Sequence, residues 1–236
     1  MKADRPKQFL TLAGKTVLEH SLTLLLSTLP TDFNNPPAKV VLVMNEEYRG
    51  EFEHLVGGSG GRLIFADPGI ERQGSVENGL NKLKESSPSC TFCAVHDSAR
   101  PLVTPNEIFS VVSDAFANGA AVLGVPCKAT IKESSDGETV LRTIPRSRLW
   151  EIHTPQVIGI ETLSRGFEKV RRENLEVTDD VSIVEAMGEK VKLTRGEYTN
   201  LKITTPEDME VAEAIIKDRK RAEGKKSLWR RLLRRL

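Results

Sequence analysis

Residues 91–101 read TFCAVHDSARP, an apolar run that passes directly into a charged loop. Thr91–His96 has the length and composition of a buried strand, and Asp97 and Arg100 follow it. Ligands of open α/β sheets bind beyond the carboxyl ends of the strands, where such a loop lies. A carboxylate and a guanidinium placed there suit a metal and phosphate site. They equally suit a structural Asp–Arg pair that closes the turn.

Strand-like and helix-like segments alternate on both sides of this stretch. The expected strands are 39–44, 62–66, 91–96, 120–126 and 190–194, and the expected helices are 15–29, 75–84, 161–173, 179–187 and those that begin at Thr104 and Thr205. Both threonines precede proline, with an acidic side chain three positions on, which is typical of a capped helix start. The alternation predicts an α/β fold with a doubly wound, mostly parallel, Rossmann-like sheet and helices on both of its faces.

The alternation is interrupted at residues 128–144. Two extended segments, 129–133 and 139–143, flank Asp136-Gly137, which is a hairpin turn signal. A polar hairpin inserted in an α/β sheet is either a solvated edge or an arm that projects from the body. We favour an arm, at about 127–147, that contacts a partner subunit, because a hairpin alone is only marginally stable.

Length and composition limit the class of protein. A chain of 236 residues that is 39% hydrophobic can form one large α/β domain, expected at 1–217, before a basic tail at 218–236. A net charge of +1 gives no bias toward nucleic acid. Three cysteines fit a reducing compartment better than a disulfide framework, and Cys90 and Cys93 are interpreted as buried thiols rather than a metal or redox pair. No apolar run reaches the roughly 18 residues that span a bilayer.

The tail changes character, because Leu228, Leu232 and Leu236 recur every four residues among arginines. A basic amphipathic segment of this kind can bind an anionic membrane surface. The other interpretation is a solvated C-terminal extension. We favour the extension, because one short tail gives weak support for membrane contact.

Other residues in the chain can bind a nucleotide or neutralise phosphate. Gly69 and Ser75 precede an expected helix, where backbone N–H groups and a hydroxyl can bind a base or phosphate. Ser75 is also in the position of a plain N-cap. Lys7, Arg100, Arg146 and Lys202 lie at the ends of expected elements, Lys202 on a short strand. Together they would neutralise phosphates at a sheet edge, and individually each is also explained as a solvated surface charge.

Several motifs in one order carry a family resemblance. They are Pro6-Lys7-Gln8-Phe9, Glu71-Arg72, His96-Asp97-Ser98-Ala99-Arg100-Pro101, Leu149-Trp150, Thr154-Pro155-Gln156, Thr178-Asp179 and Asn200-Leu201-Lys202-Ile203-Thr204. From about residue 5 to about residue 217 the sequence resembles 2-C-methyl-D-erythritol 4-phosphate cytidylyltransferase, an enzyme of non-mevalonate isoprenoid biosynthesis. Residues 120–126 and 177–185 resemble the plant and algal forms in particular.

The resemblance implies a nucleotidyltransferase in which a phosphate oxygen of methylerythritol phosphate attacks the α-phosphorus of CTP and pyrophosphate leaves. No covalent enzyme intermediate is needed, so catalysis is positioning and charge stabilisation. The implied catalytic residues are Lys7, at the pentacoordinate phosphorus, and Arg146 and Lys202, at the attacking phosphate. Asp97, Arg100, Thr154 and Thr178 are implied to bind substrate, and Gly69, Ser75 and Ser98 to bind the nucleotide. Mg²⁺ or another divalent cation is the implied cofactor, with Asp97 a candidate ligand.

The family also implies a homodimer joined through the arm, so that Arg146 and Thr154 serve the neighbouring subunit's site. The implied location is the plastid stroma for a plant or algal chain and the cytoplasm for a bacterial one. Family members begin with an apolar strand and a glycine-rich loop that holds the triphosphate, and neither precedes Lys7. We therefore expect an incomplete copy of a longer protein, without its transit peptide and with severely reduced activity.

Two other functions remain open at this point. One is a cytidylyltransferase for another polyol phosphate, such as ribitol 5-phosphate, which would share Lys7, Asp97 and Arg100. The other is a truncated, non-catalytic dimerising protein.

Overall fold

The computed structural model describes residues 5–29 and 38–233, and Leu236 of the leucine repeat lies outside them. Two compact units divide the chain. Unit 1 is formed by residues up to Thr23, by Asp97–Thr104 and by the chain from Tyr198 onward, and unit 2 by Leu24–His96 and Pro105–Glu197. That residues 1–217 form a single domain stays a prediction.

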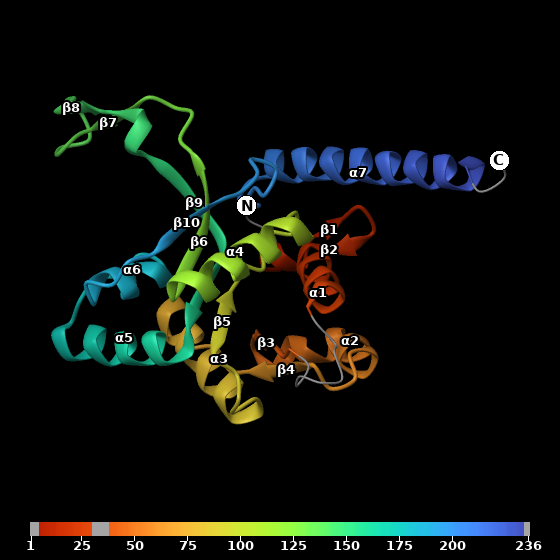
Figure 1. Ribbon diagram of the computed structural model, residues 1–236, viewed down its shortest axis with the longest axis horizontal. Coiled ribbons are helices and arrows are strands. Elements are labelled where there is room, and N and C mark those ends of the chain that lie inside the picture. The colour runs from red at the N-terminus through yellow and green to blue at the C-terminus, as the bar shows by residue number, and fades with distance from the viewer. Residues whose placement is uncertain (1–4, 30–37, 234–236) are drawn as a thin grey trace. The chain divides into compact units, whose positions relative to one another are not determined.

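Unit 2 contains a four-stranded sheet in the order β10-β6-β9-β5 (Figure 1). The strands are β5 (Phe92–Val95), β6 (Ala120–Pro126), β9 (Trp150–Gly159) and β10 (Lys192–Arg195). β10 is parallel to β6, whereas β9 is antiparallel to both β5 and β6. Three of the four strands therefore run in one direction, as predicted, and β9 is the reversed one. A parallel pair, β3 (Val40–Val43) and β4 (Leu63–Ala66), lies in the same unit.

Strand β9 was not among the expected strands. Proline within a run argues against a central strand, because it cannot donate a ladder hydrogen bond. In the structure the β6–β9 register shifts after Val122, which pairs with Gln156, and resumes at Gly124, which pairs with Ile152. Pro155 consequently lies outside the paired positions, and the central strand tolerates it.

Helices cover both faces of this sheet, as predicted. One core packs α3 (Arg72–Ser86), α5 (Ile160–Glu173) and α6 (Asp180–Ala186) on the sheet through Leu80, Phe167 and Val184, against Val122 of β6. Successive strand residues point to opposite faces, so the neighbouring Leu123 faces away from this core. α4 (Pro105–Asn118) contacts β6, β9 and β10 and covers that other face. A 3-10 helix (Glu46–Phe52) and α2 (Glu53–Gly58), neither of them predicted, lie between β3 and β4.

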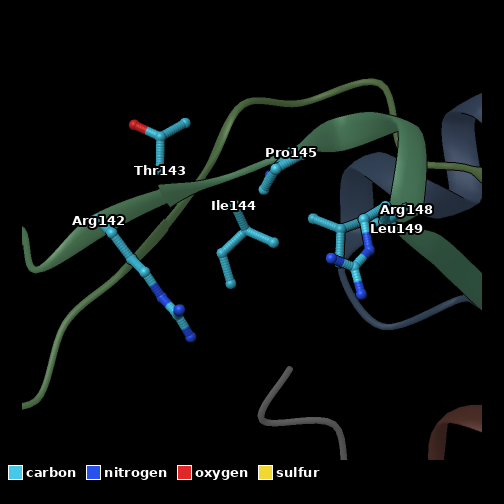
Figure 2. Close-up of a pocket in the computed structure, with 6 residues that line it drawn as sticks. All are labelled: Arg142, Thr143, Ile144, Pro145, Arg148 and Leu149. Atoms are coloured by element: carbon cyan, nitrogen blue, oxygen red, sulfur yellow. The ribbon is translucent and has the colours of Figure 1, made fainter.

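The predicted hairpin is confirmed. β7 (Ile131–Glu133) and β8 (Arg142–Ile144) pair antiparallel in a sheet of their own. Figure 1 shows this arm at the end of β6 and β9 opposite to α5. At its base, a pocket of about 360 Å³ is lined by Arg142, Thr143, Ile144, Pro145, Arg148 and Leu149 (Figure 2).

Unit 1 begins with a 3-10 helix (Lys7–Phe9) and a short antiparallel hairpin of β1 (Thr11–Leu12) and β2 (Lys15–Thr16). α1 (Val17–Thr28) starts two residues later than predicted, because Lys15 and Thr16 pair with β1 across a turn in which Ala13 and Gly14 have positive φ. The core of this unit is formed by Leu12, Val17, Leu102, Ile203, Ala212 and Ile216. The short strand expected around Lys202 is wrong, since residues 201–204 form an irregular segment.

Helix α7 (Pro206–Leu233) begins as predicted, in a reciprocal cap. The Asp208 N–H donates to Thr205 Oγ1 at 3.3 Å, and the Thr205 N–H donates to Asp208 Oδ2 at 2.8 Å. The helix runs without a break past position 217, where the basic tail was expected to begin. Within 5–29 and 38–233, no helix has the combined length and apolar character that a membrane span requires.

The three cysteines are free thiols. Cys93 and Cys127 are buried, as interpreted from the sequence for Cys93, and Cys90 is half-buried. Burial raises the pKa of the Cys93 thiol to about 12, so it stays protonated at neutral pH.

Candidate active site

In unit 1 the loop after β5 lies beside the segment that leads into α7. Lys202 Nζ is 2.7 Å from Asp97 Oδ2, with the two side chains 42% and 20% exposed. The Ile203 N–H donates to the Ala99 carbonyl at 2.8 Å, which holds the two segments together. Two motifs about a hundred residues apart thus place a carboxylate and an ammonium in contact. A salt-bridged, half-exposed lysine keeps donors available for a phosphate oxygen.

Arg100, expected to bind substrate, is buried in the same unit. Its Nη1 donates to the Asn200 carbonyl at 2.6 Å, and Asn200 itself is fully buried. The backbone N–H of Arg100 donates to the Asp97 carbonyl and closes the loop. Arg100 therefore helps to fix the Asn200–Lys202 segment, and that it binds substrate stays a prediction.

Two further expected residues belong to unit 1. Lys7 is half-buried at the start of the first 3-10 helix, ahead of the buried Phe9. Ser98 follows Asp97, and its carbonyl accepts a hydrogen bond from the Ser21 hydroxyl at 3.4 Å.

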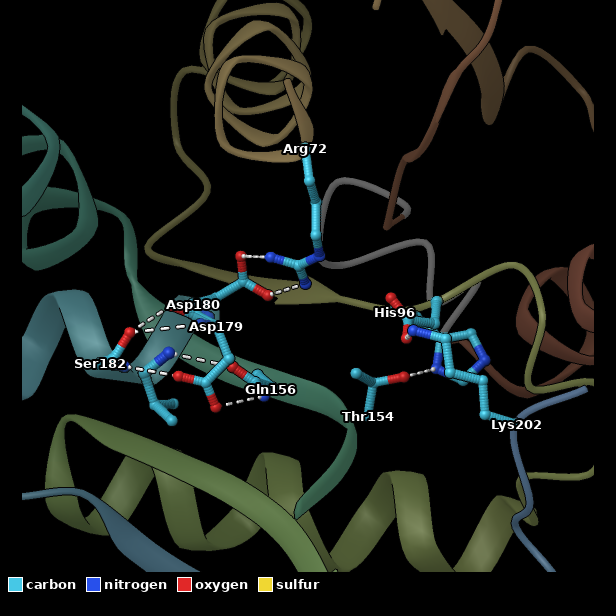
Figure 3. Close-up of polar contacts among 10 residues, drawn as sticks. Arg72, His96, Thr154, Gln156, Asp179, Asp180, Ser182 and Lys202 are labelled. Atoms are coloured by element: carbon cyan, nitrogen blue, oxygen red, sulfur yellow. Dashed lines mark hydrogen bonds and ion pairs between the residues drawn. The ribbon is translucent and has the colours of Figure 1, made fainter. Parts of the chain in front are cut away.

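In unit 2 the hydroxyl of Thr154 lies on β9 and is buried. Thr154 Oγ1 is 3.0 Å from His96 Nδ1, at the end of β5 (Figure 3). His96 belongs to the quoted motif, but no role was inferred for it from the sequence. In the structure it orients a hydroxyl that was expected to bind substrate.

Thr178, another expected substrate residue, is exposed and immediately precedes the N-cap of α6. Asp179 caps this helix: its Oδ1 accepts the Ser182 N–H at 2.9 Å, and the Ser182 hydroxyl contacts the Asp179 backbone in return. Gln156, from β9, completes the cap. Its Oε1 accepts the N–H groups of Asp180 and Val181, both at 2.9 Å.

Arg72 and Asp180 join the starts of two helices. The Arg72 guanidinium binds both carboxylate oxygens of Asp180, at 2.9 and 2.6 Å (Figure 3). The Asp180 side chain is 2% exposed, so the pair compensates an otherwise costly buried charge. The motif that contains Arg72 did not predict this contact, because the two residues are 108 positions apart.

Gly69 and Ser75, both expected at the nucleotide, are brought together. The Gly69 N–H donates to Ser75 Oγ at 3.0 Å, and that hydroxyl donates to the Glu71 carbonyl at 3.1 Å. A Cβ on Gly69 would lie 2.5 Å from the Gly74 carbonyl carbon, so the tight loop requires glycine. The N-cap of α3 is Glu71, so the interpretation of Ser75 as a plain N-cap is wrong.

Arg146 lies on the arm, away from the residues at the start of α6. It is exposed, and its Nη1 donates to the Lys128 carbonyl at 2.8 Å, across the base of the hairpin. That Arg146 acts at the attacking phosphate stays a prediction.

Asp97 is the candidate ligand for a divalent cation. Among the residues that the structure describes, no three His, Cys, Asp or Glu side chains gather as a metal site. Mg²⁺ at phosphate-transfer sites is usually held by one or two carboxylates together with the substrate phosphates. A single carboxylate at the end of a strand, as Asp97 is, fits that kind of site.

The α/β fold and the family that the chain matches identify it as a nucleotidyltransferase. The 2-C-methyl-D-erythritol 4-phosphate cytidylyltransferase family matches residues 1–218. The chain belongs to this family, and the resemblance noted from the motifs is confirmed.

Individual relatives support the assignment. The chloroplastic 2-C-methyl-D-erythritol 4-phosphate cytidylyltransferase of Oryza sativa subsp. japonica is 44% identical over 93% of this chain and 71% of its own length. The enzyme of the same name from Halalkalibacterium halodurans is 39% identical over 94% of this chain and 93% of its own. The crystal structure of the enzyme from Thermus thermophilus superposes with a TM-score of 0.70 at 31% identity, over 89% of this chain and 93% of that one.

Proposed function

We propose that this chain transfers a cytidylyl group from CTP to 2-C-methyl-D-erythritol 4-phosphate, in non-mevalonate isoprenoid biosynthesis. A phosphate oxygen of the polyol phosphate attacks the α-phosphorus, the bond to the β-phosphate breaks, and pyrophosphate leaves. The observation that carries the proposal, beside family membership, is the contact between Lys202 and Asp97 at 2.7 Å. A fixed ammonium of this kind stabilises developing charge on phosphate oxygens without reorganisation during the reaction.

The roles of the cations follow from their positions. Lys202 holds the attacking phosphate, and Asp97 orients its ammonium through their salt bridge. Lys7 stabilises the charge that builds on the α-phosphate. Arg100 acts as a support, because its guanidinium is bound to the Asn200 carbonyl.

The two threonine hydroxyls and the loop ahead of α3 bind different substrates. Thr154 and Thr178 bind the polyol, Thr154 with its hydroxyl held by His96. The Gly69–Ser75 loop and Ser98 bind the nucleotide, because the start of a helix offers backbone N–H groups to a phosphate or a base.

Mg²⁺ or another divalent cation would be held by Asp97 and by phosphate oxygens of CTP. When bound, it supplies neutralisation of the triphosphate charge. Asp97 would then serve both as a ligand of the ion and as the partner that orients the Lys202 ammonium.

Arg146 is proposed to act across a homodimer. It is exposed on an arm whose surface includes the apolar side chains of Val140 and Leu141, 57% and 64% exposed. Apolar groups on an extended hairpin favour contact with a second copy. The setting is the plastid stroma or a bacterial cytoplasm, which the chloroplastic and bacterial relatives support.

The test is pyrophosphate release from CTP with methylerythritol phosphate, and with ribitol 5-phosphate as the competing acceptor. The proposal expects release with methylerythritol phosphate and its loss in Lys202→Ala. Release that is equal or greater with ribitol 5-phosphate would favour the other cytidylyltransferase. No release with either acceptor would favour a non-catalytic protein.

A further inference from the structure

Gln156 is a buried polar side chain to which neither the motifs nor the family match gives a role. It is 2% exposed, in the buried second half of strand β9. Its Oε1 accepts the Asp180 and Val181 N–H groups, and its Nε2 donates to Asp179 Oδ2 at 3.0 Å (Figure 3). A buried amide with its carbonyl and its amine both bonded has one permitted orientation.

This amide completes the start of α6. The first N–H groups of a helix have no partner within the helix. Here the first two are bound by Gln156, and the third is bound by Asp179. A side chain from a strand thus holds the helix start from outside, and it also holds the capping carboxylate.

The contact fixes two hydroxyls relative to one another. Thr154 lies two residues before Gln156 on β9, and Thr178 directly precedes the Asp179 cap. Without the Gln156 amide, Asp179 and Ser182 would still cap α6 locally, but the cap would lose the three hydrogen bonds that join it to β9. The spacing between Thr154 and Thr178 is therefore set through Gln156.

We propose that Gln156 is a positioning residue for the polyol phosphate: its amide ties the Thr178 segment to the strand that carries Thr154. The inference rests on the proposed function, which places both hydroxyls at the polyol. The residue binds no substrate atom itself. It sets the affinity for methylerythritol phosphate and leaves the affinity for CTP unchanged.

The test reverses one hydrogen bond without changing shape. Gln156→Glu puts a carboxylate opposite the Asp179 carboxylate, and Asp179→Asn puts an amide opposite the Gln156 amide. Gln156→Glu breaks the Nε2–Oδ2 contact. Asp179→Asn breaks either that contact or the Ser182 hydrogen bond, because an amide has only one oxygen for two N–H donors. The double change restores both, with donor and acceptor exchanged between positions 156 and 179. Binding of methylerythritol phosphate and of CTP is measured by calorimetry on the full chain and on each variant. Hydrogen exchange at the Asp180 and Val181 amides reports the cap directly.

Each single variant is expected to bind methylerythritol phosphate about tenfold more weakly, as for the loss of one hydrogen bond to a charged group. The double variant is expected to recover to within about threefold of the original affinity. CTP affinity stays constant, and Val111→Ala, a buried truncation in α4, serves as the control for general destabilisation. Should the single variants unfold, the double variant still tests the inference: a folded double variant that binds CTP normally but methylerythritol phosphate more than about tenfold more weakly would contradict it.

Unchanged affinity in folded single variants, or no recovery in the double variant, would overturn the inference alone. No binding of methylerythritol phosphate by the original chain would instead overturn the proposed function, and the inference with it. The two failures are therefore distinguishable in one series of titrations.

Discussion

The Arg72 guanidinium binds both carboxylate oxygens of Asp180, at 2.9 and 2.6 Å, and so joins the first residue of α3 to the first residue of α6. Asp180 is 2% exposed at its side chain, whereas Arg72 is 46% exposed. The carboxylate is the partner that cannot be hydrated if the pair is broken. The buried Asp180 carboxylate thus depends on Arg72, whereas the Asp180 N–H is held separately by Gln156.

Arg72→Ala is therefore expected to lower the free energy of unfolding by about 2 kcal/mol, below the range for a fully buried pair because Arg72 is half exposed. Asp180→Asn on the Arg72→Ala background removes the buried charge and is expected to recover part of this loss. Urea unfolding of the two variants measures both effects. A double variant that is no more stable than Arg72→Ala would argue against an uncompensated Asp180 charge.

Lys202→Ala is expected to lower kcat/KM for methylerythritol phosphate by about 10²–10³, the usual cost of removing one preorganised donor to a transition-state charge. Asp97→Asn keeps the shape and weakens the salt bridge, so we expect a smaller loss. Steady-state pyrophosphate release gives both values. Glu213, which pairs with Lys217 on α7, provides the control, since Glu213→Gln changes a surface ion pair and is expected to leave the rate unchanged. An equal effect of the Lys202 and Glu213 variants would contradict the role of Lys202.

If Arg146 serves the neighbouring subunit, two inactive variants can complement one another. Arg146→Ala and Lys202→Ala homodimers are each expected to be impaired. After mixing and exchange of subunits, a heterodimer has one site with both residues intact, so activity is expected to rise toward about a quarter of the original. A mixture no more active than its components, with exchange shown by mass spectrometry, would mean that Arg146 acts within its own subunit or not at all.

Asp208 makes the start of α7 sensitive to pH. The Thr204 hydroxyl, and then the backbone N–H groups of Thr204 and Thr205, lower the pKa of this carboxyl. Because the pKa of Asp208 is lower in the folded state, the ionised carboxylate stabilises the fold. This stabilisation is complete above the unfolded-state pKa of about 4, and it is lost as the pH falls through the folded-state pKa. Asp208→Ala is expected to lower the melting temperature at neutral pH, because the start of α7 loses its reciprocal cap. The melting temperatures of the original chain and of Asp208→Ala are expected to converge in acid. A difference in melting temperature that persists in acid would exclude the carboxylate as its cause.

The sequence predicted the elements whose apolar runs are uninterrupted, such as β6, and the helix starts marked by Thr-Pro, such as Thr205-Pro206. It did not predict β9, because Pro155 is unfavourable in a central strand unless a register shift removes it from the ladder. Lys202 was expected on a short strand before a capped helix, yet the backbone there is held irregular by Arg100 and by the Ala99 carbonyl.

Local sequence pattern also predicted only part of the candidate site. Lys202 was expected with Arg100 among the cations at a sheet edge, and its contact with Asp97 was not predicted. The contacts of Gln156 and of the Arg72–Asp180 pair join residues 24 to 108 positions apart, and local pattern carries no information on them. Serine is a common N-cap residue, so Ser75 fitted that role. The start of α3 at Arg72 shows that Ser75 lies inside the helix instead.

The central claim is that a phosphate oxygen of methylerythritol phosphate attacks the α-phosphorus of CTP. Methylerythritol phosphate labelled with ¹⁸O in its phosphate group, incubated with CTP, Mg²⁺ and this chain, tests it by ³¹P NMR and mass spectrometry of both products. The account predicts a CDP-methylerythritol product that carries ¹⁸O in the diphosphate bridge, and pyrophosphate free of label. Label in the pyrophosphate, or an unlabelled bridge, would contradict it.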